Sequence, residues 1–283
     1  MMTLDTPIFD AHSHAFPDTI AAGAIASLKA ETLWEPVEAH HDGTVRGLIE
    51  TMDRAGIKRT ILCSIATRPT QVRKITDWSA AIACERIVPF ASIHPDFEDV
   101  EAEAERIASL GLRGIKLHPQ YMKCAADDPR MLRIARAAAR FGLALTIHAG
   151  YDLSFPKDEL ASPRQILTLA ESAPGLRVLA CHMGGWERWE EVLDELAGQP
   201  VWLETSYALE DCPGPLLEAI LANHPPEYLL FGTDSPWADQ RKELELFMAL
   251  PISDETKRLA LWDNAERFLQ SPSSRGAAAV GSP

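Results

Sequence analysis

The chain has 283 residues, 46% of them hydrophobic, so it is long enough to form one large domain with a substantial core. Its formal net charge of -14 repels the phosphates of nucleic acids and of anionic membranes, and we expect neither as a partner. Five cysteines, an odd number without a CxxC pair, are typical of buried thiols in a reducing compartment and predict a cytoplasmic protein.

Short apolar runs alternate with longer amphipathic stretches along the chain. The runs are nearly continuous in Val, Ile, Leu and Phe, as expected for strands that are buried on both faces of a parallel sheet. The expected strands are 7–12, 59–65, 87–93, 112–118, 143–148, 177–182, 201–206 and 228–233.

The amphipathic stretches have the boundaries of helices, because several begin with acidic residues or proline and end at glycine. The expected helices are 44–56, 97–111, 129–142, 162–172, 187–198, 214–224, 240–249 and 254–269. Eight strands alternating with eight helical segments predict an α/β fold, the (β/α)8 or TIM barrel, as a single domain over residues 1–270.

Two segments depart from this alternation. Residues 15–42 separate the first expected strand from the first expected helix. Loops that follow strands build the active-site face of such a barrel, so we expect this insertion to form a lid. Residues 271–283 are small, polar and without pattern, which predicts a disordered tail.

Side chains that bind metals gather where the expected strands end. His12 and His14 close the first strand, two residues apart and therefore on one side of it. His148 ends the fifth strand, His182 ends the sixth, and Asp234 follows the eighth. The carboxyl ends of parallel barrel strands meet at one mouth, and imidazoles with a carboxylate suit a divalent ion such as zinc. The pattern predicts a metal site of His12, His14, His148 and Asp234.

Each of these residues also has a purely structural interpretation. A histidine at a strand end is often hydrogen-bonded to backbone, and Asp234 fits the N-cap of a following helix. Lys116 and His118, at the end of the fourth strand, fit an ion pair and a backbone contact equally well. The metal interpretation is favoured because all of the residues fall at strand ends on the same face.

Five motifs in order, FDAHSH, GIKLHP, TIHAG, ACHMGG and FGTDSPW, resemble the amidohydrolase superfamily. The resemblance is closest to the amidohydrolase-related branch of TIM-barrel metal-dependent hydrolases, which also contains aminocarboxymuconate-semialdehyde decarboxylase, and it extends from about residue 7 to 269. It implies that His12, His14, His148 and Asp234 hold the primary metal, and that Asp234 also moves the proton of the attacking water. It further implies that His182 is an acid/base or a ligand of a second ion.

The resemblance leaves the number of metal ions open. In phosphotriesterase-like members, the lysine of the fourth strand is carboxylated and bridges two ions, which would make Lys116 a ligand. Without that modification, Lys116 would instead bind an anionic group of the substrate. We therefore expect one or two divalent ions, with Zn²⁺ preferred and Mn²⁺ as the alternative.

The favoured interpretation is hydrolysis of an amide, ester or lactone of a small molecule by metal-activated water, with Asp234 and His182 as catalytic residues. The alternative is metal-dependent, non-oxidative decarboxylation of an aromatic or unsaturated acid, in which His182 or Asp234 supplies a proton to carbon. A non-enzymatic barrel predicts a missing ligand, and none of the expected ligands is missing. The expected substrate-binding residues are His118, Lys116, Arg68, Tyr151 and Trp237. The sequence is also compatible with a homodimer.

Overall fold

The computed structural model describes residues 6–270, and within them eight parallel strands form a closed ring in chain order. Strands β1 to β3 pair in one sheet and β4 to β8 in another. A bridge between Ala91 and Ile115 joins the two sheets at one seam, and a bridge between Ser13 and Ser235 joins them at the other. The strands are β1 (Ile8–Ser13), β2 (Ile57–Cys63), β3 (Ile87–Phe90), β4 (Gly114–Leu117), β5 (Ala144–Ile147), β6 (Val178–Ala180), β7 (Trp202–Glu204) and β8 (Leu229–Leu230).

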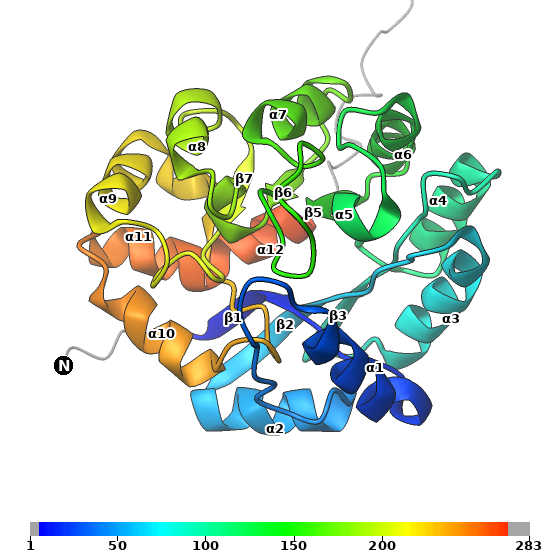
Figure 1. Cartoon of the computed structure of the whole chain (residues 1–283), viewed down its shortest axis with the longest axis horizontal. Helices are drawn as coiled ribbons and strands as arrows, with labels where there is room; N and C mark the ends of the chain where they lie inside the picture. Colours follow the sequence, from blue (N-terminus) through cyan, green and yellow to red (C-terminus); the bar gives the residue numbers. More distant parts are fainter. Residues whose placement is uncertain (1–5, 271–283) are drawn as a thin grey trace, which may run out of the picture.

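Helices surround this ring of strands, which confirms the predicted (β/α)8 barrel (Figure 1). The α-helices are α1 (Asp18–Glu31), α2 (Val45–Ala55), α3 (Val72–Ile82), α4 (Val100–Ser109), α5 (Pro119–Met122), α6 (Pro129–Arg140), α7 (Pro163–Glu171), α8 (Trp189–Glu195), α9 (Gly214–Asn223), α10 (Gln240–Ala249), α11 (Asp254–Arg258) and α12 (Asn264–Leu269). Short 3-10 turns occur at η1 (Pro69–Gln71), η2 (His182–Gly184) and η3 (Pro226–Tyr228), and a π-helical turn at η4 (Leu259–Asp263).

Helix α3 was not among the expected helices, although it fills the β2–β3 connection. It begins after Gln71, whose side chain does not cap it, and it ends at Ala83 instead of a glycine. The residues that mark the boundaries of the other expected helices, acidic residues or proline at the start and glycine at the end, are therefore missing at both ends of α3. Strand β8 is also shorter than the expected 228–233, because only Leu229 and Leu230 pair with β7.

The core has two parts that follow from the alternation of side chains along the strands. Alternate residues such as Phe9 and Ala11 of β1, or Ile61 and Cys63 of β2, belong to a small cluster that also includes Phe268 of α12. The remaining strand residues pack with the surrounding helices in a larger cluster. Helix α12 thus covers one end of the barrel and leaves the opposite end for function.

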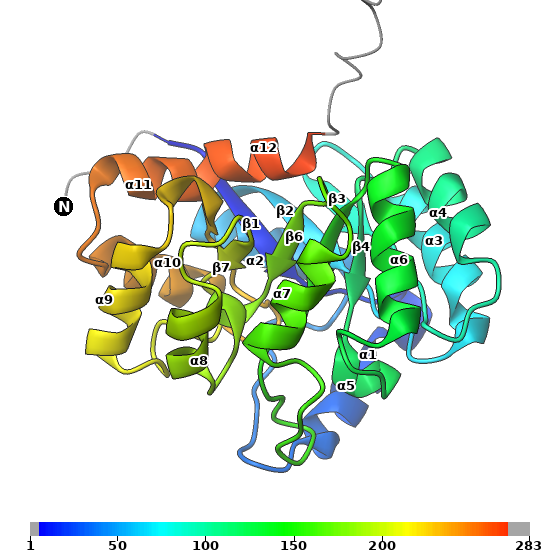
Figure 2. The same cartoon turned by 90° about the horizontal axis from the view of Figure 1, so that it is seen from above.

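That opposite end is covered by α1, α5 and the loop that follows β5 (Figure 2). The expected lid, residues 15–42, contains helix α1 and is attached to the β5 loop. Trp34 Nε1 donates to the Phe155 carbonyl at 2.8 Å, and Leu33 N donates to the Leu153 carbonyl at 2.8 Å. The tail at 271–283 lies outside the described residues, and none of the described helices is both long and apolar enough to cross a membrane.

Candidate metal centre and active-site pocket

A cavity of about 200 Å³ opens at the carboxyl ends of the strands and contains almost every residue expected to act. Arg68 is the exception, because its side chain is exposed after β2 while its neighbour Thr67 lines the cavity. The expected residues that line the cavity are His12, His14, Lys116, His118, His148, Tyr151, His182, Asp234 and Trp237.

Three of the expected metal ligands form one tight group. His14 Nε2 lies 2.9 Å from Asp234 Oδ1, His12 Nε2 lies 3.4 Å from the same oxygen, and the two Nε2 atoms lie 3.1 Å apart. These atoms come from the end of β1 and from the segment after β8. They meet because Asp234 N donates to the His12 carbonyl at 2.8 Å across the β1–β8 seam.

His148 lies beside this group and faces His182. Its Nδ1 is 3.1 Å from His182 Nε2, and its ring stacks on His118 with centroids 4.1 Å apart. The structure therefore brings together His12, His14 and Asp234 directly, with His148 adjacent to His182 rather than within their cluster.

The outer nitrogens of the histidines show which atoms are free to bind a cation. His14 Nδ1 lies 2.7 Å from the Cys63 carbonyl, and His148 Nε2 lies 2.9 Å from the Tyr151 carbonyl. His182 Nδ1 likewise lies 3.2 Å from the Ser206 carbonyl. A carbonyl oxygen only accepts hydrogen bonds, so each of these nitrogens carries a hydrogen.

His12 follows the same rule through a carboxylate, because its Nδ1 lies 3.0 Å from Glu204 Oε1. Among these rings, burial lowers the pKa values of His12 and His148 far enough to keep them neutral, so His12 Nε2 and His148 Nδ1 carry lone pairs. His12 Nε2 faces His14 Nε2, and His148 Nδ1 faces His182 Nε2, each at 3.1 Å. Nitrogens this close need a hydrogen or a cation between them, and two imidazoles with the Asp234 carboxylate form a donor set that fits a divalent metal.

Burial keeps this site in the protonation states that a metal requires. It lowers the pKa values of His12 and His148 well below the ordinary range, so both rings are neutral. Burial would by itself raise the pKa of Asp234, but the adjacent His12 and His14 lower it below its ordinary value, and the group is a carboxylate.

The backbone at two of these residues is held in an uncommon conformation. Asp234 has φ 60° and His182 has φ 59°, in the left-handed region that residues other than glycine rarely adopt. Such conformations persist where the surrounding structure imposes them, and they concentrate at functional sites. They turn both side chains toward the cavity directly after strands β8 and β6.

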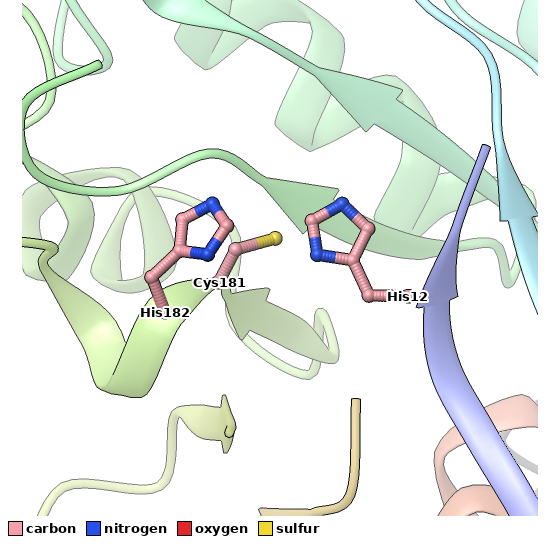
Figure 3. Close-up of side chains that lie close together, drawn as sticks. All are labelled: His12, Cys181 and His182. Carbon is pink, nitrogen blue, oxygen red and sulfur yellow. The ribbon is translucent and has the colours of Figure 1, made fainter. Parts of the chain in front are cut away.

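Lys116 and Cys181 lie deeper, below the histidines. Lys116 Nζ is 3.0 Å from His12 Nε2 and 3.1 Å from Cys181 Sγ, and only 1% of the residue is exposed. Figure 3 shows the Cys181 sulfur directed between the rings of His12 and His182. Burial raises the pKa of Cys181 well above its ordinary value, so its side chain is a neutral thiol.

His118, expected to bind substrate, lies on the β5 side of the cavity. Its Nε2 is 3.3 Å from Asp152 Oδ2, and its ring contacts Tyr121 edge-on with centroids 4.7 Å apart. Burial lowers the pKa of His118 well below its ordinary value, so the ring is neutral. Asp152 lies in a loop, and nothing in its sequence position identified it beforehand.

Glu204 and Ser206 are further site residues that the sequence interpretation missed. Both follow from the strand-end rule used for the histidines, because they close the apolar run VWLETS of β7. The sequence interpretation applied the rule to the histidines and to Asp234 but not to Glu204. Glu204 contacts His12 and the backbone of His182.

The closed parallel barrel with a histidine–carboxylate cluster at its carboxyl end defines a metal-binding TIM-barrel enzyme. The chain belongs to the amidohydrolase family, whose model, Amidohydro_2, matches residues 9–270. No curated protein matches the sequence.

Solved structures share the fold over nearly the whole chain at low sequence identity. The 5-carboxyvanillate decarboxylase of Sphingomonas paucimobilis is 16% identical, with TM-score 0.70 over 94% of this chain and 100% of that one. A TIM-barrel protein of Bordetella bronchiseptica, described as uncharacterized, is 20% identical, with TM-score 0.72 over 93% and 98%. A dihydroxybenzoic acid decarboxylase of a Polaromonas species, solved with manganese and 2-nitroresorcinol, is 15% identical, with TM-score 0.68 over 93% and 97%.

Proposed function

We propose that the protein is a metal-dependent, non-oxidative decarboxylase of a small aromatic carboxylic acid. The observation that carries the proposal is the combination of a buried cation, Lys116, with aromatic walls around the histidine cluster. An apolar cavity of about 150 Å³ holds a benzene ring, so a cavity of about 200 Å³ suits a single substituted ring. The aromatic walls are Tyr121, Tyr151, Trp186, Tyr207 and Trp237.

The comparisons support this reaction more than hydrolysis, because the similar structures include decarboxylases of carboxyvanillate and dihydroxybenzoate. The sequence had left open a carboxylated Lys116 that bridges two ions, as in phosphotriesterase-like hydrolases. Burial lowers the pKa of Lys116, but the groups around it, Asp234 among them, raise it more, to about 12, which supports an unmodified ammonium group. An ammonium group has no lone pair with which to form a carbamate.

A divalent metal would be held by His12, His14 and Asp234, with the adjacent His148 as a candidate further donor through Nδ1. Such an ion, Mn²⁺ or Zn²⁺, would supply positive charge that stabilises the negative charge developing beside the carbon that loses CO₂. These donors serve borderline ions of both kinds, and a structure with manganese is among the similar ones. The proposal covers either metal.

The chain's own residues position the acid and supply the proton. Lys116 directs its ammonium group toward the anionic end of the substrate, and the aromatic walls hold the ring and exclude water. His182 takes a proton from solvent on Nε2 and delivers it to the ring carbon. The bond between that carbon and the carboxylate breaks, its electron pair stays on the ring, and CO₂ leaves.

The experiment is a paired assay of the enzyme after removal of metal and reloading with Mn²⁺ or Zn²⁺. Hydroxylated benzoates are monitored for CO₂ release and for the change in ultraviolet absorbance. Ester, lactone and amide substrates are monitored for acid release. We expect CO₂ release that requires the metal, and no turnover of the second panel. Turnover of lactones or amides without CO₂ from any aromatic acid would show that the protein is a hydrolase.

Two variants separate metal binding from proton transfer. His14→Ala is expected to lose both metal and activity, because it removes a donor that lies 2.9 Å from Asp234 Oδ1. His182→Asn is expected to keep the metal and to lower kcat by about 10²-fold or more, the usual contribution of a general acid. Full activity in His182→Asn would assign proton delivery to Asp234, the other proton donor that the sequence suggested.

A further inference from the structure

Glu204 lies at the end of β7 with none of its surface exposed, and it contacts both halves of the histidine cluster. Its Oε1 accepts hydrogen bonds from His12 Nδ1 at 3.0 Å, from the backbone N of His182 at 2.9 Å and from Ser206 Oγ at 2.9 Å. Its Oε2 accepts from the backbone N of Ser206 at 2.7 Å. A single carboxylate therefore joins the metal-ligand histidine of β1 to the histidine after β6.

Ser206 extends this contact to the ring of His182. Its hydroxyl donates to Glu204, so the oxygen presents a lone pair to His182 Nδ1 at 3.0 Å. His182 Nδ1 must then be the protonated nitrogen, as its contact with the Ser206 carbonyl also requires. The hydrogen on Nδ1 of each ring faces the Glu204–Ser206 pair, and Nε2 of each ring faces the cavity.

We infer that Glu204 is a positioning residue that fixes the tautomers of His12 directly and of His182 through Ser206. This inference rests on the proposed metal-dependent function. A carboxylate that accepts the outer N–H of a ligand histidine fixes the ring orientation and makes the inner nitrogen more basic. Without it, His12 is free to place its hydrogen on Nε2, where a metal has no lone pair to bind.

Gly232 shows that the fold reserves space for this carboxylate. A Cβ atom at position 232 would overlap Glu204 Oε2, so any side chain there displaces the carboxylate. The same FGTD segment carries Asp234 two residues later. Gly232 therefore provides the space that Glu204 needs to support His12.

Glutamine cannot replace Glu204 without losing one of these contacts. If the amide oxygen takes the place of Oε1, its NH₂ group meets the backbone N–H of Ser206, and two donors face each other. If the amide is turned, its NH₂ group meets His12 Nδ1 and the His182 N–H. That orientation favours the tautomer of His12 with hydrogen on Nε2, which opposes metal binding.

The test compares Glu204→Gln with Ser206→Ala and with a matched control, Glu243→Gln. Glu243 of α10 is 5% exposed and does not line the cavity, and burial raises its pKa to about 8, so glutamine mimics its neutral form. Mn²⁺ affinity is measured by titration of the metal-free proteins, thermal stability is measured without metal, and kcat is measured at saturating Mn²⁺.

We expect Glu204→Gln to bind Mn²⁺ about 10- to 100-fold more weakly than wild type, the usual effect of losing such a supporting contact. Ser206→Ala is expected to keep Mn²⁺ affinity within a few-fold, because Glu204 still accepts from His12 Nδ1, and to lower kcat, because it removes the hydroxyl contact with His182 Nδ1. Glu243→Gln is expected to match wild type in both. Gly232→Ala displaces the Glu204 carboxylate without removing it, and is therefore also expected to weaken Mn²⁺ binding. It serves as the second variant if Glu204→Gln does not fold.

Wild-type Mn²⁺ affinity in both Glu204→Gln and Gly232→Ala would overturn the inference. So would a loss in Glu204→Gln that Glu243→Gln shares, because that loss would reflect the removal of any buried acid. These results differ from failure of the proposed function, which would appear as a wild-type protein that binds no divalent metal or that binds it without releasing CO₂.

Discussion

Replacing Gly150 with alanine tests how the loops after β5 and β6 hold the metal site. Gly150 has φ 91° and forms a parallel bridge with Trp186, and an added Cβ would overlap the backbone nitrogen and oxygen of Trp186. The left-handed backbone costs about 1–3 kcal/mol for alanine. Forcing the two backbones apart adds about 1–3 kcal/mol more, as overpacking does elsewhere.

The expected total is therefore a loss of about 2–6 kcal/mol of unfolding free energy, which lowers Tm by roughly 4–24 °C at about 2–4 °C per kcal/mol. Gly56→Ala is the matched control, because Gly56 has φ 75° and no atom within 4 Å of an added Cβ. It isolates the backbone conformation from the overlap. Tm is measured by differential scanning calorimetry on both metal-free variants.

Gly150→Ala should also weaken metal binding, since the next residue, Tyr151, supplies the carbonyl that orients His148 at 2.9 Å. A Tm decrease no larger than that of Gly56→Ala would refute the reasoning, because it would mean that the two loops move apart without cost. If Gly150→Ala is destabilised but binds metal with unchanged affinity, the bridge between Gly150 and Trp186 does not control the orientation of His148.

Two further predictions concern stability. Burial lowers the pKa of His224 to about 4 from its ordinary 6.5, so between these values the unfolded chain binds a proton that the folded chain does not. Stability should fall by up to about 3 kcal/mol as pH decreases from 6.5 to 4, and His224→Gln should flatten this dependence in urea unfolding at each pH. Trp34→Ala removes ring contacts to Trp186 at 5.3 Å and Tyr151 at 5.9 Å, which should cost about 1–3 kcal/mol and speed proteolysis within residues 15–42. Trp34→Phe, which retains a ring, should show less than half of that effect, and an equal effect would assign it to the indole N–H.

The strand-end residues were predictable from the sequence because parallel strands bring their carboxyl ends together whatever fills the loops. His12, His14, His148 and Asp234 needed only the positions of the apolar runs, and all of them line one cavity. The same reasoning would have found Glu204 had it been applied to every acid. Helix α3 was missed because its ends carry neither a capping side chain nor a glycine.

Other features depend on contacts between distant segments and were not predictable from local pattern. The direction of Arg68 depends on how the chain turns into η1 after β2, and the turn leaves the side chain exposed. Which nitrogen of His148 could bind a cation depends on the Tyr151 carbonyl, which accepts the hydrogen of Nε2 and leaves Nδ1 facing His182. Asp152 reaches His118 only because the β5 loop folds back over the cavity.

The same donors hold a metal for hydrolysis and for decarboxylation, so the difference between the two reactions lies in what surrounds them. A hydrolase must admit a water molecule as nucleophile, whereas a decarboxylase must exclude water and place a proton beside a carbon. Here the wall above the metal donors is aromatic, and the segment containing α1 is fastened across it through Trp34. The buried group beside His12 is the ammonium of Lys116, which matches an anionic substrate rather than a neutral amide or ester. These surroundings are why we propose loss of CO₂ from a bound acid rather than attack by water.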